Sequence, residues 1–208
     1  MLGTFFLVFV IAISSGNVVA AAAILAIMIY AGGPVSGGHF NPAVTLGVTM
    51  LGKLSVNKMW QYWTAQFLGS LIAVGLVHLM SGVVLNVARS DSATLSQAFI
   101  VEFIFTFSLV MTVLMTAYHK AAPNSYFGIA IALNIVVAAY TVGPVSGAIL
   151  NPALGMIPTL YRMATGSVFQ LDNVFLYAAA PLLGGLCAAG FSKLVMTEEH
   201  SHSPKVTA

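Results

Sequence analysis

The hydrophobic positions of this 208-residue chain fall into long runs separated by short stretches rich in glycine, proline, asparagine and serine. A helix rises about 1.5 Å per residue, so about 20 apolar residues cross a hydrocarbon core of about 30 Å. The pattern predicts an all-α membrane protein with six transmembrane helices and two half-length helices. The predicted spans are 1–15, 18–31, 59–80, 98–118, 126–145 and 174–196, and the half-length pieces are 41–51 and 151–161.

The first predicted span is short, because the polar cluster at 14–17 follows only about 15 residues. We expect it to thin the bilayer locally, to tilt little, or to be the remainder of a longer natural N-terminus. After residue 196 the chain is polar, and we expect the tail at 197–208 to be disordered.

The composition agrees with a membrane protein and excludes several other classes. The chain is 59% hydrophobic and 6% charged, whereas a soluble domain carries about 25% charged residues. A net charge of +2 does not indicate nucleic acid, and the single cysteine, Cys187, excludes a disulfide framework or a thiolate metal cluster. So few charged groups also argue against an enzyme, and we expect neither a cofactor nor a metal.

The basic residues predict the orientation in the membrane. With the N-terminus inside, the inner segments hold Lys53, Lys58, Lys120, Lys193 and Lys205, and the outer segments hold Arg89 and Arg162. Inner loops carry an excess of lysine and arginine in membrane proteins. Both termini are therefore predicted to be cytoplasmic.

The two halves of the chain repeat each other. The sequence Gly-Pro-Val-Ser-Gly occurs at 33–37 and again at 143–147, and Asn-Pro-Ala recurs at the same offset, at 41–43 and 151–153. Tyr62 and Gly69 are similarly echoed by Tyr177 and Gly184. The halves are about 1–82 and 96–196, and each contains three spans. Because three is odd, the second half enters from the opposite side, as in inverted repeats.

Each Asn-Pro-Ala is predicted to begin a half-length helix. Asparagine is a favoured N-cap, and proline is tolerated in the first helical turn because its missing N–H would be unpaired there. Since the two half-helices enter from opposite sides, we expect Asn41 and Asn151 to meet near the middle of the membrane.

At these residues the chain resembles the major intrinsic protein family, the aquaporins and aquaglyceroporins. Residues 36–45 are similar to the family's first signature loop, 151–153 to its second, and 62–66 to its third span. The resemblance covers 1–196 and implies one channel domain, with six spans around a pore and four subunits in a homotetramer. It implies that the pore motifs are Asn41, Pro42, Ala43, Asn151, Pro152 and Ala153. It also implies that Glu102 accepts hydrogen bonds from the second loop, whereas the matching position in the first half precedes residue 1.

The four positions of the family's outer selectivity filter are taken here by apolar residues. By spacing from the two motifs they fall on Ala21, Ala139, Ala148 and Leu154. Water-selective relatives usually have an aromatic residue, a histidine, a small residue and an arginine there. We expect a wide, apolar ring that discriminates weakly. Gly155, where glycerol-conducting members commonly have aspartate, points away from the typical glycerol facilitators.

The leading hypothesis is a passive channel for water and small neutral solutes such as glycerol, urea and ammonia. Paired half-helix dipoles would exclude ions and protons from it. The alternatives are a secondary transporter coupled through Glu102, and a junctional membrane protein with a closed pore. The expected location is the plasma membrane or an intracellular vacuole-type membrane. His39 has two interpretations, a structural hydrogen bond in its loop and a pore-lining or gating role.

Overall fold

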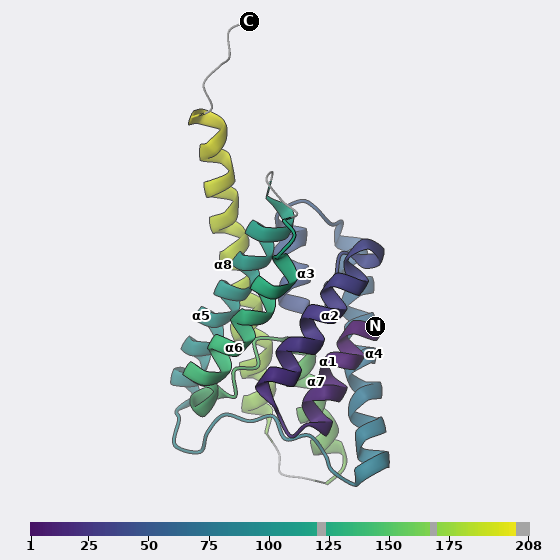
Figure 1. Cartoon of the computed structure of the whole chain (residues 1–208). Coiled ribbons are helices and arrows are strands. Elements are labelled where there is room, and N and C mark those ends of the chain that lie inside the picture. The colour runs from purple at the N-terminus through teal and green to yellow at the C-terminus, as the bar shows by residue number, and fades with distance from the viewer. Residues whose placement is uncertain (120–123, 167–169, 203–208) are drawn as a thin grey trace, which may run out of the picture.

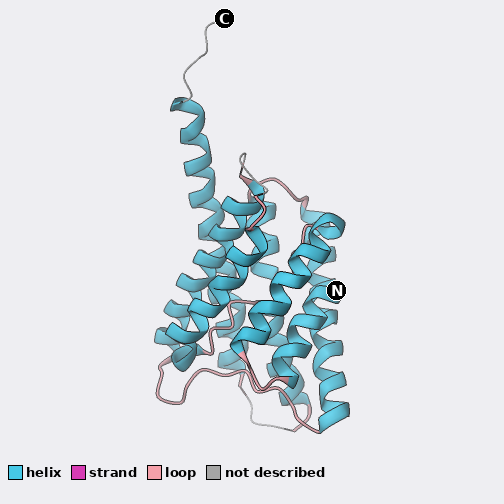
Figure 2. Ribbon diagram, in the orientation of Figure 1, coloured by secondary structure: helices cyan, strands magenta, loops and turns pink. Residues whose placement is uncertain are grey.

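The computed structural model describes residues 1–119, 124–166 and 170–202. These residues are helical apart from connecting turns and loops, and they contain no strand (Figure 2). The predicted all-α fold is therefore confirmed. The elements are α1 (Leu2–Ile13), α2 (Val18–Ser36), α3 (Pro42–Met50), α4 (Val56–Ser81), α5 (Leu95–Val113), the π-helical turn η1 (Leu114–Tyr118), α6 (Phe127–Ser146), α7 (Pro152–Ala164) and α8 (Leu171–His202).

Five helical stretches within the described residues are long and apolar enough to cross a membrane. These are α2, α4, α6, residues 171–196 of α8, and α5 together with η1. The first predicted span is a shorter apolar helix, since α1 has 12 residues and measures about 18 Å at 1.5 Å per residue. It nevertheless occupies the place of a span, because it packs against α2 and α4.

Helix α2 runs farther than the hydrophobic pattern predicts. The expectation that it ends at residue 31 is wrong, since it continues through Pro34 to Ser36. Proline removes one backbone hydrogen bond, but the hydroxyl of Ser36 donates to the carbonyl of Gly32 at 3.2 Å. Gly37, with φ +74°, then ends the helix by donating its N–H to the carbonyl of Gly33. Helix α6 ends in the same way at Gly147.

The C-terminal helix also extends beyond the predicted span. The expectation that the chain is disordered after residue 196 is wrong for 197–202, which continue α8. Residues 191–202 contain neither glycine nor proline, so nothing in this stretch interrupts the helix. In Figure 1 this end of α8 projects beyond the rest of the bundle. Residues 203–208 of the predicted tail lie outside the described residues.

The helices pack in corresponding pairs from the two halves. Helix α1 packs on α4, and α5 packs on α8, while α2 and α6 contact each other across the centre. The short helices cross between the halves, so that α3 contacts α8 and α7 contacts α4. In Figure 1, α3 lies in the upper part of the bundle and α7 in the lower part. The chain thus enters the bundle from opposite ends to begin these two helices.

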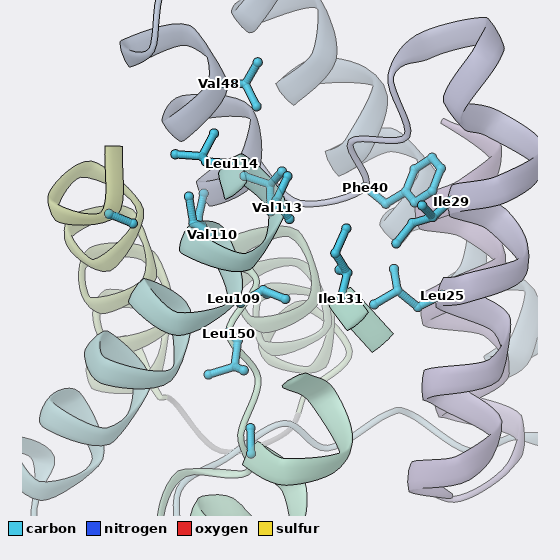
Figure 3. Packing of buried hydrophobic residues seen from close by; sticks show 14 of the residues in the cluster. Leu25, Ile29, Phe40, Val48, Leu109, Val110, Val113, Leu114, Ile131 and Leu150 are labelled. Carbon is cyan, nitrogen blue, oxygen red and sulfur yellow. The ribbon is translucent and has the colours of Figure 1, made fainter. Parts of the chain in front are cut away.

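A hydrophobic cluster joins the two halves at the centre. It includes side chains from α2, α3, α5 and α6 together with Phe40 and Leu150, the residues before the two asparagines. Figure 3 shows Leu25 and Ile29 of α2 facing Ile131 of α6. This packing positions the two loops that lead to α3 and α7.

Candidate functional site

Asn41 and Asn151 meet where α3 and α7 begin. Asn41 Nδ2 donates to the carbonyl of Leu150 at 2.7 Å, and Asn151 Nδ2 donates to the carbonyl of Phe40 at 3.1 Å. The Oδ1 atoms accept the N–H groups of Ala43 and Ala153, as N-caps do. Because Oδ1 is engaged in the cap, each side chain is oriented with its N–H hydrogens turned away from its own helix.

Glu102 lies behind the loop that leads to Asn151. Its Oε1 accepts hydrogen bonds from Ser146 Oγ at 2.7 Å and from the N–H of Ile149 at 2.8 Å, and its Oε2 accepts from the N–H of Leu150 at 2.7 Å. The same loop holds Ala148 and Leu150 at φ +50° and +53°. The left-handed region costs a non-glycine residue about 1–2 kcal/mol. The carboxylate therefore holds a loop whose backbone would otherwise relax.

The loop that leads to Asn41 is held by different groups. Gln66 Nε2 donates to the carbonyl of His39 at 2.8 Å and to the hydroxyl of Thr45 at 2.9 Å. The hydroxyl of Thr4 donates to the carbonyl of Phe40 at 3.3 Å. In this loop the backbone groups that are held are the carbonyl oxygens of His39 and Phe40, whereas in the other loop Glu102 holds backbone N–H groups. The two loops are therefore supported by different chemistry.

Two tyrosines anchor the starts of these loops in equivalent ways. The hydroxyl of Tyr62 donates to the carbonyl of Ser36 at 2.7 Å, and that of Tyr177 donates to the carbonyl of Ser146 at 2.6 Å. Both carbonyls belong to the last residue of a helix, where no intrahelical donor remains. The echo of Tyr62 by Tyr177 in the sequence indicated equivalent positions but assigned them no role.

A cavity of about 490 Å³ reaches both asparagines. Its lining comes from α1, α2, α5, η1 and α6, from the first turns of α3 and α7, from the turn between α1 and α2, from both loops, and from residues 83–88 between α4 and α5. Among the described residues that line it, none is an aspartate, glutamate, lysine or arginine. Its polar side chains are Ser15, His39, Asn41, Asn86 and Asn151. The cavity is thus uncharged and largely apolar, with its polar groups at separate points.

All four residues predicted to form the filter line this cavity. Ala21 lies on α2, Ala139 on α6, Ala148 in the second loop, and Leu154 in the first turn of α7. Leu154 is 6% exposed and belongs to a cluster with Val8 and Val74. Methyl and isobutyl groups offer no hydrogen bond, so this part of the wall can neither donate to a solute nor accept from it through its side chains.

His39 is a buried residue of the first loop, two positions before Asn41. Its Nε2 shares a hydrogen bond with the hydroxyl of Tyr118, and the residue lines the cavity. Its Nδ1 is buried and has no hydrogen-bond partner within the part of the chain that the structure describes. Both interpretations of this histidine therefore have a structural basis.

The structure also brings Asn86 to the cavity, which sequence reasoning missed. Asn86 follows α4 in a connecting segment that carries no motif, so its position depends on how that segment folds back over the bundle. It accepts a hydrogen bond from Arg162 Nη1, near the end of α7. The two residues are 76 positions apart in the sequence, which gives no local signal for this pairing.

Comparison of the coordinates with solved structures identifies the fold. The structure is similar to that of the aquaglyceroporin from Plasmodium falciparum, with a TM-score of 0.82, 22% identity and coverage of 96% of both chains. The chain therefore has the aquaporin fold, with membrane-spanning helices and two short helices that begin inside the bundle.

Sequence comparison identifies the family. The model of the family described as "Major intrinsic protein" matches residues 1–191, and the chain belongs to this family. It is 34% identical to aquaporin NIP3-1 of Arabidopsis thaliana, over 86% of this chain and 57% of the relative. It is 32% identical to nodulin-26 of Glycine max, over 83% of this chain and 62% of the relative. The chain is thus a multi-pass membrane protein that spans about three fifths of the length of these relatives.

Proposed function

We propose that the chain is a passive channel for water and small neutral solutes such as glycerol, urea and ammonia. The observation that carries this proposal is the uncharged cavity that reaches Asn41 and Asn151. Each amide has two N–H hydrogens, and one is used in the bond to the opposite loop. The other is available to the oxygen of a passing molecule. The membership of this chain in the major intrinsic protein family supports the same activity.

Ion exclusion follows from the two short helices. A helix N-terminus carries about +0.5 of an elementary charge, and α3 and α7 both begin beside the cavity. Their combined field opposes the entry of cations and protons. In this proposal, residues 41–43 and 151–153 form the central barrier, Ala21, Ala139, Ala148 and Leu154 form the outer ring, and Glu102 supports the second loop.

A coupled transporter is less well supported than a channel. Transport against a gradient needs a group that binds the coupling ion, and Glu102 is the candidate within the spans. Its two oxygens already accept three hydrogen bonds, and it is not among the residues that line the cavity. The cavity, which His39 and Asn86 both line, favours a channel over a protein with a closed pore.

Stopped-flow measurements on proteoliposomes test this proposal. We expect faster osmotic shrinkage than in protein-free liposomes, together with urea and glycerol uptake that never exceeds the external concentration. Uphill uptake driven by an ion gradient, and lost in Glu102→Gln with shrinkage unchanged, would favour the transporter. No shrinkage above that of protein-free liposomes would favour the closed pore.

We also propose that the protein is a homotetramer in the plasma membrane or a vacuole-type membrane, with both termini in the cytoplasm. We further propose one channel domain over 1–196, built from inverted repeats at about 1–82 and 96–196. The packing of α1 on α4 and of α5 on α8 supports the repeats. Exposed apolar side chains on α2 and α6, such as Ile27 and Val137, suit contact with lipid or a neighbouring copy. Native mass spectrometry of the detergent-solubilised protein tests the tetramer, and a monomer at all detergent concentrations would contradict it.

A further inference from the structure

The outer end of the cavity is poor in hydrogen-bond donors. The side chains of the predicted ring cannot donate, and the N–H groups of the adjacent loop are already used. The N–H of Ala148 donates to Ser146 Oγ, and those of Ile149 and Leu150 donate to Glu102. A solute that leaves water here loses hydrogen bonds, and this loss costs free energy unless the wall replaces them.

The segment at 83–88 supplies polar side-chain atoms at this end. All six of its residues line the cavity, and Asn86 is the polar one. The segment is anchored on both sides of Asn86. Leu85 packs against the cluster that contains Leu154, and the carbonyl of Val87 accepts a hydrogen bond from the hydroxyl of Thr159 at 3.4 Å. These contacts hold the segment that carries Asn86 at the cavity wall, where Asn86 is itself exposed.

Arg162 sets the orientation of the Asn86 amide. Arg162 Nη1 donates a hydrogen bond to Asn86 Oδ1. Because the guanidinium has only donors, it bonds the carbonyl oxygen of the amide and not the NH₂ group. The NH₂ group of Asn86 then points away from Arg162 and has no partner among the described residues. Arg162 itself is not part of the lining. Ser15 is the other polar side chain at this end, but its hydroxyl is not fixed by a comparable contact.

We propose that Asn86, oriented by Arg162, is a further specificity-determining residue that donates a hydrogen bond to the oxygen of an entering neutral solute. This inference rests on the proposed channel function. The solutes concerned carry a carbonyl or hydroxyl oxygen, of which urea is the simplest probe. Water in single file keeps hydrogen bonds to its neighbours, whereas urea loses more of its hydration and gains more from a fixed donor. Asn86 therefore raises urea permeability relative to water permeability.

The test compares urea and water permeabilities of proteoliposomes containing equal amounts of full-length protein. The informative variants are Asn86→Leu, which removes the amide, and Asn86→Asp, which keeps an acceptor for Arg162 but has no donor. A hydrogen bond contributes about 0.5–1.5 kcal/mol net, so we expect the urea-to-water ratio to fall about two- to tenfold in both. Ser92→Ala is the matched control, because Ser92 is exposed in the same connection and does not line the cavity.

The variant Arg162→Met should lower the urea-to-water permeability ratio as the Asn86 variants do. Arg162→Lys retains a donor for Asn86 Oδ1, so its ratio should lie between those of Arg162→Met and the native protein. An unchanged ratio in a folded Asn86→Asp variant overturns the inference, as does a native protein that conducts water but no urea. A native protein that conducts neither contradicts the proposed channel function instead. If Asn86→Leu does not fold, Asn86→Asp alone decides the question.

Discussion

At the scale of single residues, Asn41 and Asn151 combine two tasks in one amide. Each Oδ1 caps a short helix, and each Nδ2 donates to the loop of the other half. The caps leave only donors for a solute, and the two helix N-termini add positive potential. In the proposed channel, charge selectivity therefore depends on these two residues being neutral.

We predict that Asn151→Asp admits cations. The carboxylate still caps the N–H of Ala153, so the helix is retained, but its negative charge offsets the field of the two helix N-termini. The measurement is the cation conductance of planar bilayers that contain the purified protein. Asn57→Asp, the same change at an exposed site, is the control and should conduct no more than the native protein. Equal cation exclusion in the two variants would contradict this account of selectivity.

Replacing Leu154 by arginine should reduce glycerol permeability more than water permeability. The longer, charged side chain narrows the cavity beside Ala21 and Ala148 and adds donors that suit water. Stopped-flow rates for water and glycerol on the same proteoliposomes give the ratio, which we expect to fall about tenfold or more. Leu154→Met, similar in volume and uncharged, should leave the ratio unchanged. A ratio that is the same or higher in Leu154→Arg would mean that Leu154 does not lie at the narrowest point.

At the scale of helices, the backbones of paired helices within each half approach closely at glycines. A Cβ at Gly184 on α8 would lie 2.5 Å from the carbonyl oxygen of Phe103 and 3.0 Å from the nitrogen of Phe107. A Cβ at Gly69 on α4 would meet Met1 and Phe5 of α1 at 2.5 and 3.1 Å. Because these neighbours are backbone atoms, neither pair can accept a methyl group without moving apart.

We therefore predict that Gly184→Ala destabilises the protein, whereas Gly190→Ala does not. Gly190 lies on the same helix, and a Cβ there would have no heavy atom within 4 Å. Overpacking costs about 1–3 kcal/mol, while alanine gains up to about 1 kcal/mol in an open helical position. Thermal unfolding in detergent should show a lower midpoint for Gly184→Ala only. Equal midpoints for the two variants would show that α5 and α8 can separate at no cost.

At the scale of the whole molecule, the distribution of basic residues predicts the orientation in the membrane. The lysines at 53 and 58 flank the start of α4, and Arg89 and Arg162 lie at the opposite end, where Arg89 pairs with Asp172 at 2.8 Å. Lysine and arginine near membrane spans are enriched on the cytoplasmic side. The start of α4 is therefore expected inside the cell and the connection between α4 and α5 outside.

Cysteine labelling of intact cells tests this orientation. In a Cys187→Ser background, a membrane-impermeant maleimide should modify Ser92→Cys in intact cells and Asn57→Cys only after permeabilisation. Both native residues are exposed in the structure, so a difference between them reports the side of the membrane. The reverse pattern would place both termini outside.

The sequence by itself determined the class of protein, the elements and the family resemblance. Long apolar runs with 6% charged residues allow only a membrane protein, since such a chain cannot cover a surface in water. Local rules also located the short helices, because an N-cap asparagine followed by proline is a signal carried by adjacent residues. The same local rules failed at Pro34, since α2 continues past the proline to Ser36 and ends only at Gly37.

The inverted repeat predicted that Asn41 and Asn151 meet, but only the tertiary structure decided which atoms they and other distant groups bond. The bond from Asn41 to Leu150 spans 109 positions, that from Gln66 to His39 spans 27, and that from Arg162 to Asn86 spans 76. None of these pairs is specified by spacing, because each depends on how separate helices pack and where a connecting segment returns. The cavity has the same origin, since its wall combines residues from both halves of the chain, and no single segment contains enough of the wall to predict it.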